Sequence, residues 1–208
     1  MTDTPKIEER ENGPLMAQNV PVLRGADGAI ETKDVMALCR CGASKNKPFC
    51  DGSHNAAGFE SRGGTPAGRN RLIAYEGEEI TVTYNPMVCS HAAECGRLAA
   101  HVFNPAMKPW VQPDKGTKAE VESVIKACPS GALSLGALED GVSHMVADDV
   151  EVYVQPHGPY WVKNISAPVP AKAERGSDRK YVLCRCGLSG NKPFCDGSHR
   201  DAKWRDDA

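Results

Sequence analysis

One segment of this chain occurs twice with almost no change. Residues 39–54 read CRCGASKNKPFCDGSH and residues 184–199 read CRCGLSGNKPFCDGSH, so two of the 16 positions differ. Each copy carries three cysteines and one histidine at the same spacing, C-x-C-x8-C-x3-H. A repeat of this length indicates one structural unit built twice, and it constrains the architecture before any other feature is considered.

The similarity extends to the segments that precede the cysteines. Val35–Leu38 leads directly into the first copy and Tyr181–Leu183 leads into the second, and both have the apolar composition of a strand. Further upstream, the Gly-Pro turn at 158–159 and the strand-like residues after it correspond to Gly13–Leu15. We therefore expect the strands as well as the cysteines to repeat.

The spacing within a copy suggests how its side chains meet. Cys39 and Cys41 are two residues apart, so on an extended chain both thiols lie on the same face. We expect Asp51 to be the N-cap of a helical turn, which would place Cys50 and His54, four residues apart, on one face. A strand end and a helix start would then bring four ligands together.

The number of cysteines indicates metal binding rather than disulfides. Nine is odd, so complete disulfide pairing within one chain is excluded. The nine fall into three triplets: Cys39, Cys41 and Cys50; Cys89, Cys95 and Cys128; and Cys184, Cys186 and Cys195. Triplets with nearby histidines are typical of metal ligands in a reducing compartment, so we expect a cytoplasmic protein.

Charge and hydropathy exclude two classes of partner. The formal net charge of −2 provides no basic surface for nucleic acid. The chain has no apolar run of about 18 residues, so we expect no membrane span. Aromatic residues make up only 6%, which is little for one large core and favours small modules held together by metals.

Changes in composition predict four segments. These are a disordered lead-in (1–11), a first repeat module (12–62), a middle domain (72–138) and a second repeat module (148–205). In the middle domain, Ile80–Tyr84 is typical of a strand, 98–103 could be helical, and Thr117 and Glu120 form a capping box. The expected fold class is α+β, built from small β-rich modules.

Three interpretations compete for the repeated ligand set. Buried, inert cysteines would not repeat this spacing by chance. Zinc held by three cysteines and one histidine is chemically reasonable, although zinc sites usually space the first pair as C-x2–4-C. A 2Fe–2S cluster held by three thiolates and one imidazole is the third, and we favour it.

Both copies match C-x-C-x2-S-x3-P-x-C-D-G-S-H, the signature of the CDGSH iron–sulfur domain of the mitoNEET type. This resemblance implies two 2Fe–2S clusters, one bound by Cys39, Cys41, Cys50 and His54 and the other by Cys184, Cys186, Cys195 and His199. Proteins of this family are small β-rich modules that pair as an intertwined two-fold dimer. Two modules on one chain are therefore expected to pair internally, giving a monomer with a pseudo-two-fold axis.

The middle triplet resembles a different family. Cys89-x5-Cys95 with a remote Cys128-Pro129 is similar to single-cluster bacterial ferredoxins and to the divergent 4Fe–4S mono-cluster domain. Ala92 stands where such ferredoxins have a further cysteine, and His91 beside it is a candidate fourth ligand. The resemblance implies a third cluster, of 3Fe–4S or 4Fe–4S type, in a ferredoxin-like α+β domain.

These features predict an electron carrier rather than an enzyme. The expected partners are redox proteins that donate and accept electrons. Two alternatives remain: a protein that stores 2Fe–2S clusters and transfers them to apo-proteins, and a zinc-binding interaction module.

Overall fold

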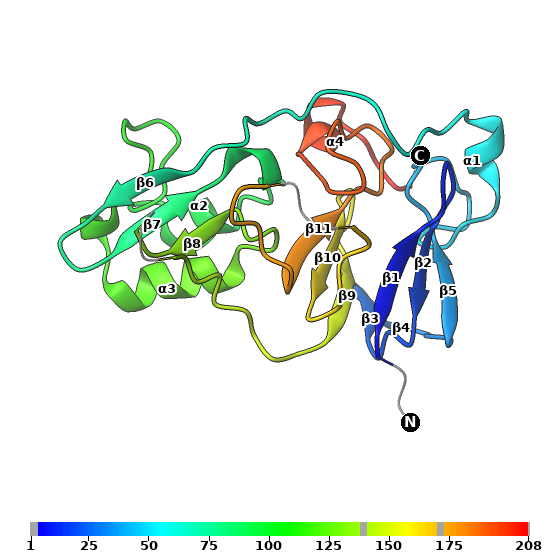
Figure 1. Cartoon of the computed structure of the whole chain (residues 1–208), viewed down its shortest axis with the longest axis horizontal. Helices are drawn as coiled ribbons and strands as arrows, with labels where there is room; N and C mark the ends of the chain where they lie inside the picture. Colours follow the sequence, from blue (N-terminus) through cyan, green and yellow to red (C-terminus); the bar gives the residue numbers. More distant parts are fainter. Residues whose placement is uncertain (1–3, 138–140, 170–172, 208) are drawn as a thin grey trace.

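A computed structural model describes residues 4–137, 141–169 and 173–207, which form three sheets and four short α-helices (Figure 1). The first sheet has the order β1-β2-β5, the second β11-β10-β9-β3-β4 and the third β6-β7-β8. The strands are β1 (Lys6–Glu9), β2 (Leu15–Gln18), β3 (Leu23–Gly25), β4 (Gly28–Ile30), β5 (Val35–Leu38), β6 (Ile73–Glu76), β7 (Thr81–Tyr84), β8 (Leu133–Leu135), β9 (Glu151–Val154), β10 (Tyr160–Lys163) and β11 (Lys180–Leu183). The helices are α1 (Ser53–Ala56), α2 (Glu94–Ala99), α3 (Lys118–Ala127) and α4 (Ser198–Asp201).

The two repeat modules have the same antiparallel core. In the first module β2 pairs with β1 and β5, and in the second β10 pairs with β9 and β11. The alternating residues Leu15 and Ala17 of β2, like Tyr160 and Val162 of β10, are buried, as the two-residue period of a strand requires. The expected repetition of the strands is confirmed.

The modules exchange strands, which makes them one intertwined unit. Strand β3 of the first module pairs in parallel with β9 of the second, with Leu23 opposite Val152. In the reciprocal direction, Lys6 of β1 forms a parallel bridge with Ser166. Apolar side chains from both modules share a single core: Ile7, Leu15, Ala17, Val20, Leu23, Met36, Leu38, Val152, Val154, Tyr160, Val162, Ile165, Tyr181, Leu183 and Phe194. The predicted internal pseudo-dimer is confirmed.

The prediction of a disordered lead-in is wrong for Lys6–Glu9, which forms β1. Ile7 is 2% exposed and packs in the shared core, so this segment has apolar surface to bury after all. Glu9 forms ion pairs with Arg40 and Arg62 at the other end of the strand. Residues 1–3 of the predicted lead-in, and Leu138 at the predicted end of the middle domain, lie outside the described residues.

The middle domain packs α2 and α3 with the sheet β6-β7-β8 (Figure 1). The capping box at Thr117 and Glu120 is confirmed at the start of α3. The expected helix at 98–103 is wrong, because α2 ends at Ala99 and Phe103 instead bridges to Val111, with both side chains fully buried. No helix within the described ranges is long and apolar enough to cross a membrane.

Candidate metal centres

The first site lies where β5 ends and α1 begins. The Sγ atoms of Cys39 and Cys41 are 3.7 Å apart, and the Sγ atom of Cys50 lies 3.4 Å from Nδ1 of His54. Backbone N–H groups point at the sulfurs, since Ala43 donates to Cys41 Sγ at 3.5 Å. Such donors stabilise thiolates and the clusters bound to them.

The second site has the same geometry. The Sγ atoms of Cys184 and Cys186 are 3.7 Å apart, and Cys195 Sγ lies 3.5 Å from His199 Nδ1. The predicted ligands of each copy therefore meet as two close pairs, one of two thiols and one of a thiol with an imidazole.

The distance between the pairs matters, because a tetrahedral zinc ion would hold all four ligand atoms within about 4 Å of one another. Among the described residues, one group of three His, Cys, Asp or Glu side chains has all its ligand atoms within 4.8 Å of one another. It consists of His157, Asp206 and Asp207. Neither repeated site contains such a group, so in each site some ligand atoms are farther apart than one ion allows. Two close pairs at a larger separation fit a two-iron cluster, with one pair on each iron.

The electrostatics favour a thiolate at the first cysteine of each close pair, whereas the same contact raises the pKa of the second cysteine, Cys41 or Cys186. The hydrogen bond from the Cys41 thiol lowers the pKa of Cys39 to about 6, and Cys186 has the same effect on Cys184. Burial lowers the pKa of His199, which keeps its imidazole neutral and able to coordinate.

Arg40 and Arg185, which stand between the paired cysteines, are at most 2% exposed and were not identified from the sequence as functional. Arg40 Nε donates to the Gly13 carbonyl at 2.7 Å, and Arg185 Nε donates to the Gly158 carbonyl at 2.8 Å. Each guanidinium thus ties its ligand loop to the turn before the central strand. The sequence did contain a signal for this role, because an arginine stands between the two cysteines in both copies.

Asp51 is not the N-cap of a helix, and Asp196 has the same geometry. Gly52 and Gly197 occupy the N-cap positions with φ of 89° and 90°. Asp51 instead accepts from the N–H groups of Ser53 (3.0 Å) and Lys45 (2.8 Å), so it ties the loop between the cysteines to the start of α1. This correction leaves the ligand assignment unchanged but gives Asp51 a role in holding the loop.

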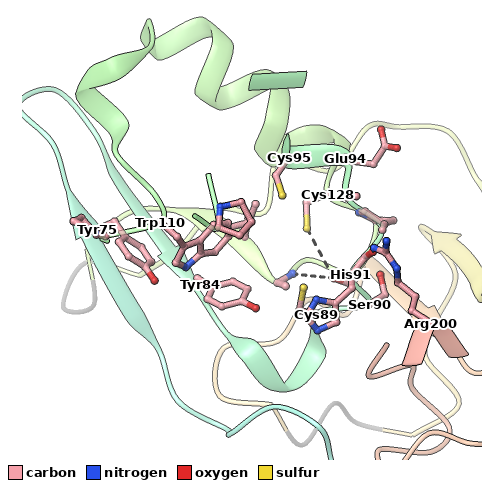
Figure 2. Close-up of a pocket in the computed structure, with 18 of the residues that line it drawn as sticks. Tyr75, Tyr84, Cys89, Ser90, His91, Glu94, Cys95, Trp110, Cys128 and Arg200 are labelled. Atoms are coloured by element: carbon pink, nitrogen blue, oxygen red, sulfur yellow. Dashed lines mark hydrogen bonds between the residues drawn. The ribbon is translucent and has the colours of Figure 1, made fainter. Parts of the chain in front are cut away.

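The middle site is a cavity of about 770 Å³. Figure 2 shows the sulfur atoms of Cys89, Cys95 and Cys128, which line this cavity together with Ala92. Burial raises the pKa of Cys89 to about 11 and also raises that of Cys95, so these thiols become thiolates only when a metal compensates the charge.

Two further observations test whether an iron–sulfur cluster fits this cavity. The three thiols do not form a group within 4.8 Å, which is the wide spacing expected around several metal ions rather than one. The hydroxyl of Ser90 lines the cavity, is buried and has no hydrogen-bond partner among the residues that the structure describes. A sulfide ion of a cluster is an acceptor for such a donor. The residues present therefore fit the group.

His91 lies between the middle site and the second site. It lines the cavity, but its ring is also in close contact with the backbone at Gly197, next to the ligands Cys195 and His199. The backbone carbonyl of His91 accepts a hydrogen bond from Arg200 of α4. Coordination of the middle cluster by His91 stays a prediction.

Comparisons with known proteins match all three segments. A family model described as an iron-binding zinc finger of CDGSH type matches residues 12–55 and 157–200, and one described as a divergent 4Fe–4S mono-cluster matches residues 75–137. "Uncharacterized protein YjdI" of Escherichia coli K12 is 46% identical over 59 residues, which cover 28% of this chain and 78% of that protein. The protein of the same name in E. coli O157:H7 matches equally well. No solved structure matches.

Proposed function

Because this chain belongs to the iron-binding CDGSH family, with two such modules flanking a divergent 4Fe–4S mono-cluster domain, we propose that it is an electron carrier with three clusters. Each CDGSH site would hold a 2Fe–2S cluster, and Cys89, Cys95 and Cys128 would hold a 3Fe–4S or 4Fe–4S cluster. The observation that carries the proposal is the paired geometry, with close pairs at 3.7 and 3.4 Å in one site and at 3.7 and 3.5 Å in the other.

The clusters would supply one-electron chemistry, and the protein sets the conditions. One imidazole in place of a thiolate removes a negative charge from the ligand set and so raises the reduction potential. The guanidinium groups of Arg40 and Arg185 are buried, and each is paired with a carboxylate, Glu9 and Asp206 respectively, so they hold the ligand loops without adding a net charge beside the clusters. Partners would be one protein that donates an electron and another that accepts it.

A second candidate function is cluster transfer, and one observation favours it. In the first site Cys41, Cys50 and His54 are only half-buried. Thiols of an apo-protein could reach ligands that are exposed to this degree, and transfer proceeds by exchange of such ligands.

Purification without oxygen tests both candidates. We expect a red-brown protein with about seven or eight iron ions and about eight sulfide ions per chain, from two 2Fe–2S clusters and one larger cluster. Electron paramagnetic resonance of the oxidised protein identifies the middle cluster, since the 3Fe–4S type gives a signal in that state and the other types do not. A colourless protein with stoichiometric zinc would contradict both candidates.

Incubation with an apo-ferredoxin separates the two functions. An electron carrier keeps its iron while it exchanges electrons, whereas a transfer protein loses 2Fe–2S absorbance as the acceptor gains it. Iron analysis of the separated proteins gives the result directly.

A further inference from the structure

The two CDGSH sites differ in how they are covered. All four ligands of the second site are buried, with exposed fractions of 1% for Cys184, 6% for Cys186, 2% for Cys195 and 6% for His199. In the first site only Cys39 is buried, at 1%, and the other three ligands are half-buried. Because the ligands and almost all residues between them are identical, the difference comes from what packs over each site.

The segment that joins the first module to the middle domain covers the second site. In Figure 1 this segment runs from α1 past α4 to β6. Its Ala67 N–H donates to the Asp196 carboxylate at 3.2 Å, and Asn191 of the same loop donates to the carbonyl of Met87 in the middle domain at 3.4 Å. The equivalent carboxylate of the first site, Asp51, is exposed and accepts from Lys45 and Ser53 of its own module.

The middle domain adds a second contact. A Cβ atom at Gly197 would collide with the ring of His91, whereas a Cβ atom at the equivalent Gly52 would meet nothing within 4 Å. Arg200 donates to the His91 carbonyl, but Asn55, its equivalent in the first module, donates to Gly52 of its own loop. The loop that holds Cys89 and His91 therefore sits on the second site alone.

One of the two differences between the copies reflects this cover. Position 45 is an exposed lysine, and the equivalent position is Gly190. A Cβ atom at Gly190 would collide with the carbonyl oxygen of Thr65 in the joining segment. Glycine is thus needed here to let two backbones approach, and any side chain would push the cover away.

We propose that the duplicated sites have different roles: the covered second site exchanges electrons with the middle site inside the protein, and the exposed first site exchanges with partner proteins. This inference rests on the proposed function, because it concerns clusters bound at these ligands. It requires that external reagents reach the first site much faster than the second.

The test is ligand accessibility in the loaded, full-length protein. The protein is incubated with an iron chelator and iodoacetamide, and peptide mass spectrometry follows alkylation of Cys41 and Cys50 against that of Cys186 and Cys195. Absorbance and released iron are recorded in parallel. We expect two phases, with the first-site cysteines labelled at least tenfold faster, because labelling of the second site requires local opening of the cover.

Two matched variants test the cause. Gly190→Lys gives the second copy the residue of the first, and it should bring labelling of Cys186 and Cys195 close to the rate of the first site. Lys45→Gly makes the reverse exchange at an exposed position, so its labelling rates should equal those of the unmodified protein. If Gly190→Lys fails to fold, His91→Ala removes the ring that packs on Gly197, while keeping the backbone carbonyl that Arg200 contacts, and should accelerate second-site labelling as well.

The outcomes are distinguishable. A protein without iron would contradict the proposed function, and the inference would fall with it. A loaded protein whose two sites are labelled at the same rate would overturn the inference alone. The two sites could also be labelled at unequal rates that neither Gly190→Lys nor His91→Ala changes. The cover would then not be the cause of the difference, and the inference would again be overturned.

Discussion

A close backbone approach between the two CDGSH modules gives a quantitative prediction. Cys41 and Cys186 pair across the pseudo-two-fold axis in an isolated bridge. The residue after each cysteine is a glycine with positive φ, 81° at Gly42 and 80° at Gly187. A Cβ atom at Gly42 would lie 2.6 Å from the carbonyl oxygen of Cys186, and one at Gly187 would lie 2.7 Å from that of Cys41.

Gly42→Ala therefore has two costs, and a matched variant separates them. Gly52→Ala places alanine at a similar φ of 89°, but with nothing within 4 Å, so it carries only the left-handed strain of roughly 1–2 kcal/mol. Gly42→Ala carries the same strain and an overpacking cost of roughly 1–3 kcal/mol, because the opposing atom is backbone. Each kcal/mol lowers the Tm of a chain of this size by about 2–4 °C.

The assay is thermal unfolding of the loaded protein at one fixed scan rate, followed by visible absorbance and circular dichroism. We expect Gly42→Ala to lower the Tm by about 2–12 °C more than Gly52→Ala does. Adding Gly187→Ala should cost less than the sum of the single changes, because both act on one contact. Equal Tm values for Gly42→Ala and Gly52→Ala would show that the modules do not meet at this bridge.

Three further predictions follow from the contacts. Tyr160→Phe removes a buried hydroxyl that donates to the Cys39 carbonyl at 2.8 Å across the modules, and should cost about 1 kcal/mol in thermal unfolding. Burial lowers the pKa of Lys180 to about 8, so from pH 8 to 10.5 the unfolded chain binds a proton that the folded protein releases. Stability relative to Lys180→Met should therefore rise over that range in denaturant titrations. In a redox titration the covered 2Fe–2S site should have the lower potential, and a single unresolved step for both sites would contradict this.

The sequence predicted the local parts of the sites because they depend on short spacings. Strand Val35–Leu38 is observed with its predicted bounds, and it delivers Cys39 and Cys41 as expected. The capping box of α3 also depends on residues three apart, Thr117 and Glu120. Such features are encoded within one turn or one strand, so no knowledge of the rest of the fold is needed.

The parts that were missed depend on contacts between distant segments. Ile7 is a single apolar residue in a charged segment, so the sequence gives no sign that it is buried. It is buried because the two modules exchange strands and form one shared core around it. Arg40 bonds to Gly13 and Glu9, which are 27 and 31 residues away. In the sequence Gly190 is an ordinary loop glycine. Its role depends on the joining segment, whose backbone at Thr65 packs against it in the folded protein.

The same contacts explain how two identical ligand sets could acquire a direction of electron flow. With equal ligands, only the surroundings can separate two reduction potentials. Reduction adds negative charge, which burial disfavours, and the second site is the buried one. The nearby cations do not set this order, because Lys45 belongs to the first site while Arg200, next to His199, belongs to the second. Burial therefore makes the first site the better electron acceptor, so an electron that reaches the covered second site has an energetically downhill path to the exposed one.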